Sequence, residues 1–386
     1  MKNMRYLSAV VGLFALLFAT TGCKEEDKPE SQTEERNPMT FNLSVATRTC
    51  YSTETYTEIT DGFWLRVTSA SGTSIYDGWA NVTDGVITLA NLEEGETLEW
   101  PEDETEKVNV IGIFYHERLY SPLSVDLNDT YDYASLSHDY FLCTAHSGDS
   151  DFKDLLVAHS IVSKSQCSGG VVNLNFQHAL TAIRTAVKMS DTRYYYELEA
   201  IYAMAYPVGA YYFSPTDTSE DKWVNYYAYE QGVMDAFEAK YGEEALEQYM
   251  EEQGGYFLGE GVMTDKEGYY IYASDGSGAD YGLGVPSSTN NNDYTLLLNR
   301  DVPDETPLQI LVIPLDVEYS MSYSIYEYTQ DGSEYTKGDL VRTIGNEGYD
   351  LGLQPTGKSV LCTVKVHMGG NSISIGGVDE EGRTMD

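Results

Sequence analysis

The stretch Asp154–Met189, DLLVAHSIVSKSQCSGGVVNLNFQHALTAIRTAVKM, carries the strand pattern that decides the fold. In its second half apolar and polar residues alternate, which places the apolar side chains on one face of a strand. The segment His178–Thr181 interrupts this alternation, which then resumes in a second strand. The inner faces of the two strands are formed by Val172, Leu174 and Phe176 and by Ile183, Thr185, Val187 and Met189. We expect both strands to contribute to a sandwich core.

Strand-like segments recur along most of the chain and favour an all-β fold. The 386 residues are 42% hydrophobic and include 33 tyrosines, and aromatic side chains suit half-buried sheet surfaces. Short apolar runs separated by Gly, Asp and Ser turns are typical of a β-sandwich. We expect an N-terminal β-sandwich over residues 39–189 and a C-terminal β-sandwich over residues 190–386.

Residues 225–253 break the strand pattern. Apolar residues recur there at four-residue spacing, at Val233, Phe237, Tyr241 and Ala245, and acidic residues occupy much of the remainder. This spacing predicts an amphipathic helix, which the pair Gly254-Gly255 would end. We expect the helical insertion to pack on a sheet, and contact with a partner through its tyrosines is the alternative.

The charge balance of the chain restricts its partners. Asp and Glu number 62 and Lys and Arg number 23, so the formal net charge is −39. A surface this acidic repels nucleic acid and anionic lipid headgroups. We therefore expect no nucleic-acid partner.

The N-terminus has the pattern of a secretion signal. Lys2 and Arg5 precede the apolar run Leu7–Thr20, which is too short to cross a bilayer about 30 Å thick as a helix. We expect a signal peptide over residues 1–22 and a flexible, polar tether over residues 23–38.

The end of the leader resembles a lipoprotein-processing box. Thr20-Thr21-Gly22 precedes Cys23, with Thr20 in place of the usual leucine. The resemblance implies that Cys23 receives the acyl chains, such as palmitate, and several chains on one residue anchor stably. The acidic segment after Cys23, Lys24–Asp27, resembles a signal for export to the outer face of the outer membrane. An ordinary signal peptide with a chance cysteine is the alternative.

Two motifs in the opening stretch resemble the fimbrillin family of Bacteroidetes surface lipoproteins. They are Asp154-Leu155-Leu156-Val157-Ala158 and Phe176-Gln177-His178-Ala179-Leu180. The resemblance is strongest over residues 39–189 and moderate over residues 294–378. It implies two transthyretin-like sandwiches in a surface-anchored fimbrial subunit or fimbria-associated adhesin, with the stalk, anchor and tip positions all open. The implied partners are other fimbrial subunits, the outer membrane through the lipid anchor, and a host or bacterial surface ligand.

The first strand of the folded chain is expected at Met39–Val45. Its inner face would be formed by Met39, Phe41, Leu43 and Val45. In fimbrillins such a strand is followed by an arginine where an extracellular trypsin-like protease cuts, which here implies Arg48. Arg36 is a competing site, and Arg48 as an ordinary loop residue is the alternative. Loss of the strand would expose an apolar groove that another subunit's strand could fill.

The sequence shows no catalytic constellation, so we expect no enzyme and no cofactor. The 6 histidines have no metal-ligand spacing, and His178 at the strand corner is interpreted as a structural hydrogen-bonding residue. The oxygen-rich loops Asp275–Asp280 and Asp331–Glu334 suggest calcium, but turn chemistry alone explains both. No metal site is therefore expected.

Four cysteines follow the lipidation site, and three disulfide pairings are open, as are isolated buried thiols. They are Cys50, Cys143, Cys167 and Cys362. An alternative function, glycan binding, depends on exposed aromatic side chains at Trp79, Trp100, Trp223 and the tyrosines of 319–328. A hydrolase has only unpatterned carboxylates to support it.

Overall fold

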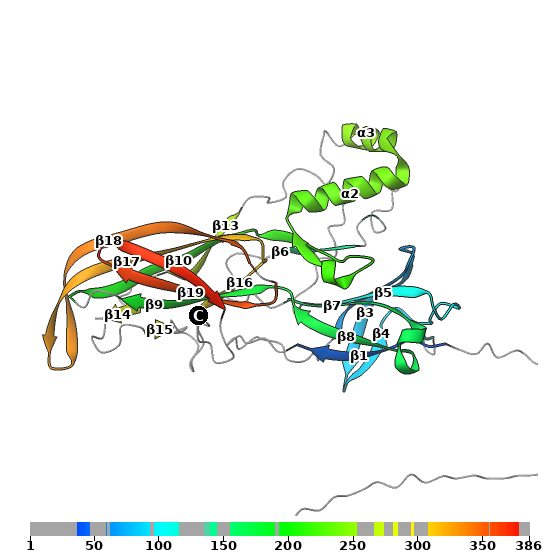
Figure 1. The fold of residues 1–386 in the computed structure, drawn as a ribbon, viewed down its shortest axis with the longest axis horizontal. Coiled ribbons are helices and arrows are strands. Elements are labelled where there is room, and N and C mark those ends of the chain that lie inside the picture. Colours follow the sequence, from blue (N-terminus) through cyan, green and yellow to red (C-terminus); the bar gives the residue numbers. More distant parts are fainter. Residues whose placement is uncertain are drawn as a thin grey trace, which may run out of the picture. The chain divides into compact units, whose positions relative to one another are not determined.

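The structure is a computed structural model. It describes residues 37–46, 59, 62–92, 96–115, 136, 139–144, 155–189, 193–252, 266–273, 281–284, 295–296, 308–354 and 356–377. All of these residues belong to the compact unit Asn37–Asp386, which is distinct from Met1–Arg36. They are mostly β-strands, arranged in several sheets (Figure 1), and this confirms the predicted all-β class.

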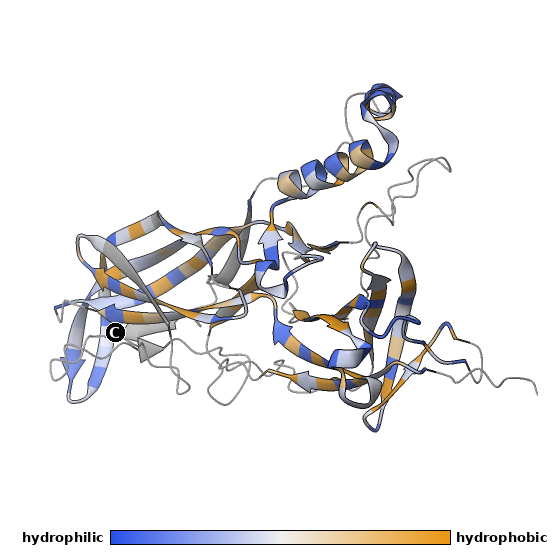
Figure 2. Cartoon of the chain, turned by 45° about the vertical axis from the view of Figure 1, so that its right-hand side comes forward, coloured by the Kyte–Doolittle hydropathy of each residue, from blue (hydrophilic) through white to orange (hydrophobic). Residues whose placement is uncertain are grey.

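The first sheet has seven strands in the order β1-β8-β7-β5-β2-β3-β4. Their bounds are β1 Thr40–Val45, β2 Gly62–Ser69, β3 Ser74–Thr83, β4 Val86–Leu89, β5 Lys107–Tyr115, β7 Leu155–Ser163 and β8 Val171–His178. Apolar side chains from both ends of the sheet meet in one core, including Met39, Phe63 and Phe176. The β1–β8 pair joins the other strands through a short contact, because β7 and β8 pair at two positions, Leu156 with His178 and Val157 with Gln177. Figure 2 shows the alternating apolar and polar bands along these strands.

Two further sheets face each other across a second core. One contains β10 (Tyr195–Ala205), β13 (Glu267–Ala273), β14 (Tyr281–Gly284), β17 (Asp316–Asp331) and β18 (Glu334–Leu353). The other contains β9 (Thr181–Met189), β15 (Thr295–Leu296), β16 (Gln309–Val312), β19 (Ser359–His367) and β20 (Gly370–Gly377). Ile183 and Val364 meet Tyr196 and Tyr323 in the core between them. This arrangement is a β-sandwich.

The small sheet β12-β11-β6 links the two larger regions. It contains β6 (Tyr140–Thr144), β11 (Val208–Tyr212) and β12 (Lys222–Val224). Tyr211 and Trp223 from this sheet share an apolar cluster with Ile113 of β5 and Ile313, which follows β16. The cluster therefore joins the outer side of the first sheet to the sandwich.

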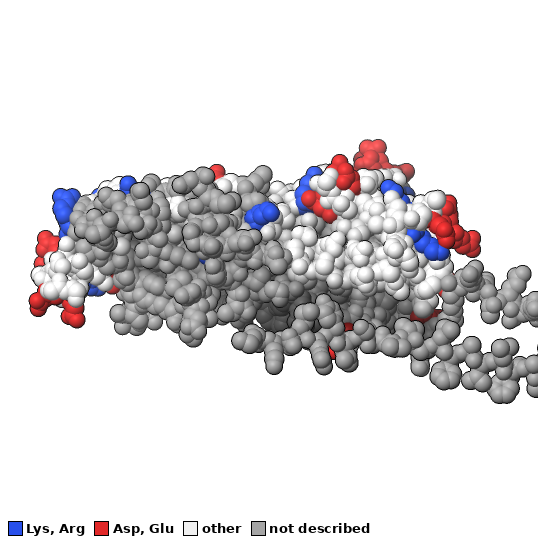
Figure 3. Space-filling model, turned by 60° about the horizontal axis from the view of Figure 1, so that its bottom comes forward, with Lys and Arg blue, Asp and Glu red and all other residues white. Residues whose placement is uncertain are grey.

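The predicted helical insertion is present as two helices, α2 (Tyr226–Tyr241) and α3 (Glu243–Glu252). Asn225 caps α2 by accepting a 2.9 Å hydrogen bond from the backbone N–H of Ala228. Gly242 separates the helices with a φ of 93°, a conformation that glycine adopts without steric cost. Tyr229, Val233 and Phe237 pack over the β6–β11 sheet, as expected for a packed insertion. Acidic side chains gather over α3 on the face drawn in Figure 3.

Strand pairing differs in one respect from the sequence interpretation. The strands β8 and β9 were expected to share one core, but β8 lies in the seven-stranded sheet and β9 pairs with β15, β16 and β19. The corner Ala179-Leu180 is buried in the cluster that joins the two regions, so the chain leaves one core and enters the next there. The domain boundary after residue 189 stays a prediction, although hydrogen bonding groups β9 with the C-terminal strands.

Three short 3₁₀ helices complete the described elements: η1 (Lys164–Gln166), η2 (Ser168–Gly170) and η3 (Thr218–Glu220). No helix in the described ranges combines the length and the apolar character that a bilayer crossing requires.

Candidate functional site: the β1 edge of the first sheet

The strand β1 pairs with β8 in parallel over its whole length. The register runs from Thr40 opposite Val171 to Val45 opposite Phe176 without a shift. Phe41, Leu43 and Val45 are half-buried against the core of the first sheet, whereas Met39 is 4% exposed. The predicted inner face of this strand is therefore present in the structure.

The opposite face of the ladder is polar. The Ser44 Oγ donates a 2.6 Å hydrogen bond to Asn175 Oδ1, and the Asn42 amide donates a 3.4 Å bond to Asn173 Oδ1. Cross-strand pairs of this kind stabilise the pairing of two strands by fractions of a kcal/mol each, on the order of 0.2–1. They fix the register of β1 without burying it.

The N-terminal end of β1 is held by backbone hydrogen bonds to the segment Leu98–Trp100, which we call the clamp. The backbone N–H of Met39 donates to Leu98 O over 2.7 Å, and the N–H of Trp100 donates to Asn37 O over 3.0 Å. The Trp100 Nε1–H also donates to Gly170 O over 3.1 Å, which ties this clamp to the loop before β8. Trp100 is 4% exposed, so the clamp excludes water from these hydrogen bonds.

The C-terminal end of β1 is held on the β8 side. The N–H of Ala46 donates to Phe176 O over 2.8 Å, and His178 Nε2 lies 3.1 Å from Ala46 O. Because a carbonyl oxygen only accepts, the Nε2 of His178 carries the proton in this contact. His178 therefore has the structural hydrogen-bonding position that its place at the strand corner predicts.

A hollow of about 910 Å³ lies beside the C-terminal half of β1. Leu43, Val45, Ile59 and Val82 supply its apolar lining, and Asp84 is the single charged residue among the described residues that line it. The other lining residues are Asn42, Ser44, Gly85, Asn173 and Asn175. Asp84 and Gly85 form the turn between β3 and β4, so both ends of the seven-stranded sheet border this hollow.

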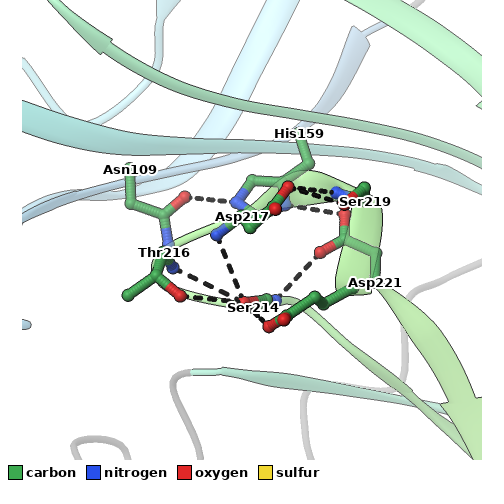
Figure 4. A network of polar contacts seen from close by, with 8 residues as sticks. Asn109, His159, Ser214, Thr216, Asp217, Ser219 and Asp221 are labelled. Carbon is green, nitrogen blue, oxygen red and sulfur yellow. Dashed lines mark hydrogen bonds and ion pairs between the residues drawn. The ribbon is translucent and has the colours of Figure 1, made fainter.

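A second polar cluster lies where β5 and β7 meet the segment before β12 (Figure 4). His159 Nδ1 lies 2.7 Å from Asp221 Oδ2, and His159 Nε2 lies 2.6 Å from Asn109 Oδ1. The side chains of His159 and Asp221 are 4% and 9% exposed. Asp221 also accepts a 2.9 Å hydrogen bond from the N–H of Ser214.

This cluster has the character of a structural link. The Ser214 hydroxyl donates to Glu220 Oε2 at 3.2 Å rather than to His159, so this hydroxyl is not placed for activation by the imidazole. No group of His, Cys, Asp and Glu side chains suited to a metal occurs in the part of the chain that the structure describes. Sequence reasoning missed the contact because 62 residues separate His159 from Asp221.

Several predicted site residues lie outside the described residues: Cys23, Arg36, Arg48, Cys50 and the loop 275–280. Lipidation and cleavage therefore stay predictions. The other oxygen-rich loop is the turn between β17 and β18, in which Asp331 pairs with Glu334 and Gly332 has a φ of 64°. Turn geometry accounts for this sequence.

Three of the four cysteines lie in described segments, and all three are free thiols. Burial raises the pKa of Cys143 and of Cys362 to about 12. Burial also raises the pKa of Cys167, which is partly exposed. These three residues therefore form no disulfide with one another.

Two of the three tryptophans proposed for glycan stacking are buried. Trp100 is 4% exposed and Trp223 is 7% exposed. The Trp223 Nε1–H donates to Ala179 O over 2.7 Å, so this side chain serves the link between the two regions. Trp79 is partly exposed. Of the tyrosines in 319–328, Tyr319 and Tyr323 are buried, whereas Tyr326 and Tyr328 are partly exposed.

No family model matches the chain, and no curated protein matches it. Solved structures do match. A "putative cell adhesion protein" from Bacteroides eggerthii is 12% identical with a TM-score of 0.40, and the match covers 88% of this chain and 95% of that chain. A "fimbrial assembly protein" from Parabacteroides distasonis is 12% identical with a TM-score of 0.38, and the match covers 89% of this chain and 97% of that chain.

A third match is a "putative adhesin" from Bacteroides ovatus, which is 11% identical with a TM-score of 0.30. It covers 89% of this chain and 93% of that chain. The structural neighbours are thus named as adhesion and fimbrial proteins of the kind that the fimbrillin resemblance implies. Their identities and TM-scores are too low to assign a function to this chain.

Proposed function

We propose that this chain is a non-enzymatic, surface-anchored fimbrial subunit or fimbria-associated adhesin in which a neighbouring subunit's strand replaces β1. The observation that supports this most directly is the position of β1 at the end of the seven-stranded sheet, where β8 is the one strand among the described residues that pairs with Thr40–Val45. An end strand can leave without breaking the sheet on both of its sides.

Removal of β1 would leave an apolar slot. Met39 is buried and Phe41, Leu43 and Val45 pack against the same core. Complete burial of one such side chain stabilises the fold by about 1.5–3 kcal/mol. Loss of β1 would therefore lower the stability of the remaining fold by several kcal/mol. A strand with the same apolar alternation would recover that free energy and restore hydrogen bonds to β8.

The proposed sequence of events begins at the cell surface. Cys23 would carry the lipid anchor in the outer membrane, and a trypsin-like protease would cut after Arg48. The strand β1 would then be free of the chain that follows it and would be held by the β8 ladder, by the Leu98–Trp100 clamp, by the His178–Ala46 contact and by its apolar packing on the core. A competing strand would displace it.

The last described strand, β20, is paired within its own sheet. The strand β20 pairs with β19 from Gly377 opposite Val360 to Gly370 opposite His367. A stalk subunit in the proposed scheme donates its C-terminal strand, and donation here would first require breaking this eight-residue pairing. The stalk, anchor and tip positions all stay open in this proposal.

A strand-uptake experiment tests the proposal. The chain is treated with trypsin, the cut is located by mass spectrometry, and a fluorescent peptide of Met39–Ala46 (MTFNLSVA) is added as a surrogate for the incoming strand. We expect uptake by the chain cut after Arg48 and none by an Arg48→Gln variant treated in the same way. A cut chain that never takes up the peptide would overturn the strand-exchange scheme. Imaging of cell-surface filaments with an antibody to this chain tests its association with fimbriae.

A further inference from the structure

The outer edge of β1 carries backbone groups that point away from β8. The N–H of Met39 bonds to Leu98 on one side of the strand, and the N–H of Ala46 bonds to Phe176 of β8 on the other. Consecutive residues of a strand direct their backbone groups to alternate sides. The N–H and C=O groups of Phe41, Leu43 and Val45 therefore share the outward direction of Met39.

Within the described ranges, no strand pairs with this outer edge beyond Met39. The strand β1 is the last strand of its sheet, and the Leu98–Trp100 segment contacts it only at Asn37–Met39. The hollow begins where this clamp ends, because Leu43 and Val45 line it. The clamp thus ends just before β1 begins, and the part of β1 from Asn42 to Val45 borders an open volume.

Comparison with β18 shows that the β1 edge lacks one common protection of sheet edges, the β-bulge. The strand β18 also ends a sheet, but its pairing with β17 shifts register near Tyr326 and Tyr328, and such bulges interrupt the row of backbone groups. The β1–β8 ladder has no register shift. Regular exposed edges of this kind accept an added strand.

We propose that the hollow beside β1 is a docking site for a basic, extended segment of another protein, which adds as a strand to the outer edge of β1 while β1 stays in place. The hollow of about 910 Å³ lies within the range of about 300–1,000 Å³ that is typical of ligand pockets. Phe41–Val45 spans about 13 Å at about 3.3 Å per residue, so four or five residues of the segment would pair.

The lining defines the chemistry of the segment. Ile59 and Val82 offer apolar contacts, so the segment carries apolar side chains at every second position. Asp84 is the charged group of the described lining, and the whole chain has a net charge of −39. Complementary charge steers association, so a lysine or arginine at the Asp84 end distinguishes this partner from a second copy of the acidic chain.

This site differs from the strand exchange proposed above. Exchange requires cleavage and the departure of β1, whereas the docking site consists of the edge of β1 itself. Cleavage followed by loss of β1 would remove the docking site. The two proposals therefore predict opposite dependences on proteolysis, and either one can fail without the other.

The test uses the full chain with Arg36→Gln and Arg48→Gln, which keeps it uncut. The probe is a fluorescent peptide, Lys-Val-Thr-Val-Thr-Val-Lys, followed by anisotropy and by amide hydrogen exchange of the protein. We expect saturable binding that slows exchange of the amides of Phe41, Leu43 and Val45. The amides of Asn42 and Ser44 already face β8, so their exchange should change little.

Peptide variants test the geometry. One peptide is N-methylated at its three valines and a second at its two threonines. Each peptide loses the backbone N–H donors along one edge of its strand, and the two edges are opposite. We expect one of the two to lose binding and the other to keep it. A peptide with glutamate in place of both lysines should bind about tenfold more weakly or worse.

Protein variants test the position. Asp84 has a φ of 52°, which asparagine also tolerates, so Asp84→Asn removes the charge and keeps the turn. It should weaken binding, whereas the matched variant Asp339→Asn on exposed β18 should not. Absence of binding to the uncut chain, binding without protection of the three amides, or equal binding by both N-methylated peptides would overturn the docking proposal.

Discussion

The backbone N–H of Met39 donates a 2.7 Å hydrogen bond to the carbonyl oxygen of Leu98 on the side of β1 away from β8. This contact holds the N-terminal end of β1 more firmly than its C-terminal half, which has no such bond on its outer side within the described residues. The N-terminal end lies between two segments of backbone, whereas Leu43 and Val45 have β8 on one side and a hollow on the other. Departure of β1 is therefore expected to begin at its C-terminal end, next to the predicted cut after Arg48.

The clamp gives the first prediction, through Gly170. A Cβ at Gly170 would lie 3.3 Å from Pro38 O and 3.4 Å from Trp100 Nε1, at a φ of 74°. Gly170→Ala should therefore have two effects. The new methyl group should push Pro38 and Trp100 apart and loosen the clamp, and the positive φ should add backbone strain of about 1–3 kcal/mol. We expect a lower free energy of unfolding in urea and faster peptide uptake by the cut chain.

A neighbouring glycine supplies the control. Gly169 has a φ of 66°, and a Cβ at this position would meet no atom within 4 Å, so Gly169→Ala introduces the strain alone. Peptide uptake by Gly169→Ala should match the unsubstituted cut chain. Equal acceleration by both variants would show that the contact with Pro38 and Trp100 does not retain β1.

The buried link between the two regions gives the second prediction. His159 and Asp221 lie 2.7 Å apart with almost no solvent exposure. Removal of one partner of a buried hydrogen bond leaves the other unsatisfied and typically costs about 1–3 kcal/mol. Asp221→Asn should therefore lower the free energy of unfolding by about that amount, measured by urea denaturation.

A double-mutant cycle separates this pair from the rest of its cluster. His159→Gln, Asp221→Asn and the double variant should give a coupling energy of about 0.5–3 kcal/mol. Additive effects of the two substitutions would contradict a direct stabilising contact.

The thiols give the third prediction. Burial raises the pKa of Cys143 and Cys362 to about 12, so both remain protonated and inaccessible at neutral pH. Iodoacetamide should modify the partly exposed Cys167 in the native protein and should reach the other two only after denaturation. Peptide mapping by mass spectrometry measures this, and native labelling of Cys143 would contradict its placement in the joining cluster.

Lys266 gives the fourth prediction, on alkaline stability. Partial burial lowers the pKa of Lys266, but hydrogen bonds to Asp316 and Glu318, at 2.6 and 2.9 Å, outweigh it and raise the pKa to about 12. Because the pKa is higher in the folded state, this stabilisation is complete below the unfolded pKa near 10.4. It is lost as the pH rises towards about 12.

The size of this effect is small, because Asp316 and Glu318 are 41% and 45% exposed. We expect Lys266→Gln to lower the free energy of unfolding by less than about 1 kcal/mol at pH 8. The difference from the unsubstituted chain should shrink as the pH rises towards about 12. A difference that grows with pH would contradict the assigned ion pairs.

Local sequence patterns predicted much of the fold. The alternation of Met39–Val45 predicted β1 almost to the residue. The helical insertion was predicted as one helix, but Gly242 divides it, because a single glycine within a periodic pattern does not show whether its φ is positive.

Features that depend on distant residues were not predictable. The assignment of β8 and β9 to different sheets depends on which strands lie beside them, and both have the same alternating pattern. The hollow beside β1 is formed by residues as far apart as Asn42 and Asn175. Sequence reasoning predicted the strand but not the open volume along its edge. The alternation of apolar and polar residues indicates which face of a strand is buried, but it does not indicate which segments lie beside the strand.

The most direct test of the central claim, that β1 leaves β8, is a reversible lock between them. Ser44 and Asn175 are paired opposite each other on the polar face, and neighbouring strands lie about 4.8 Å apart, within disulfide reach. The variant Ser44→Cys with Asn175→Cys, in a Cys167→Ser background, is oxidised, cut after Arg48 and incubated with the fluorescent Met39–Ala46 peptide. We expect no peptide uptake by the oxidised chain and full uptake after reduction. Equal uptake by the oxidised and reduced chains would contradict the displacement of β1.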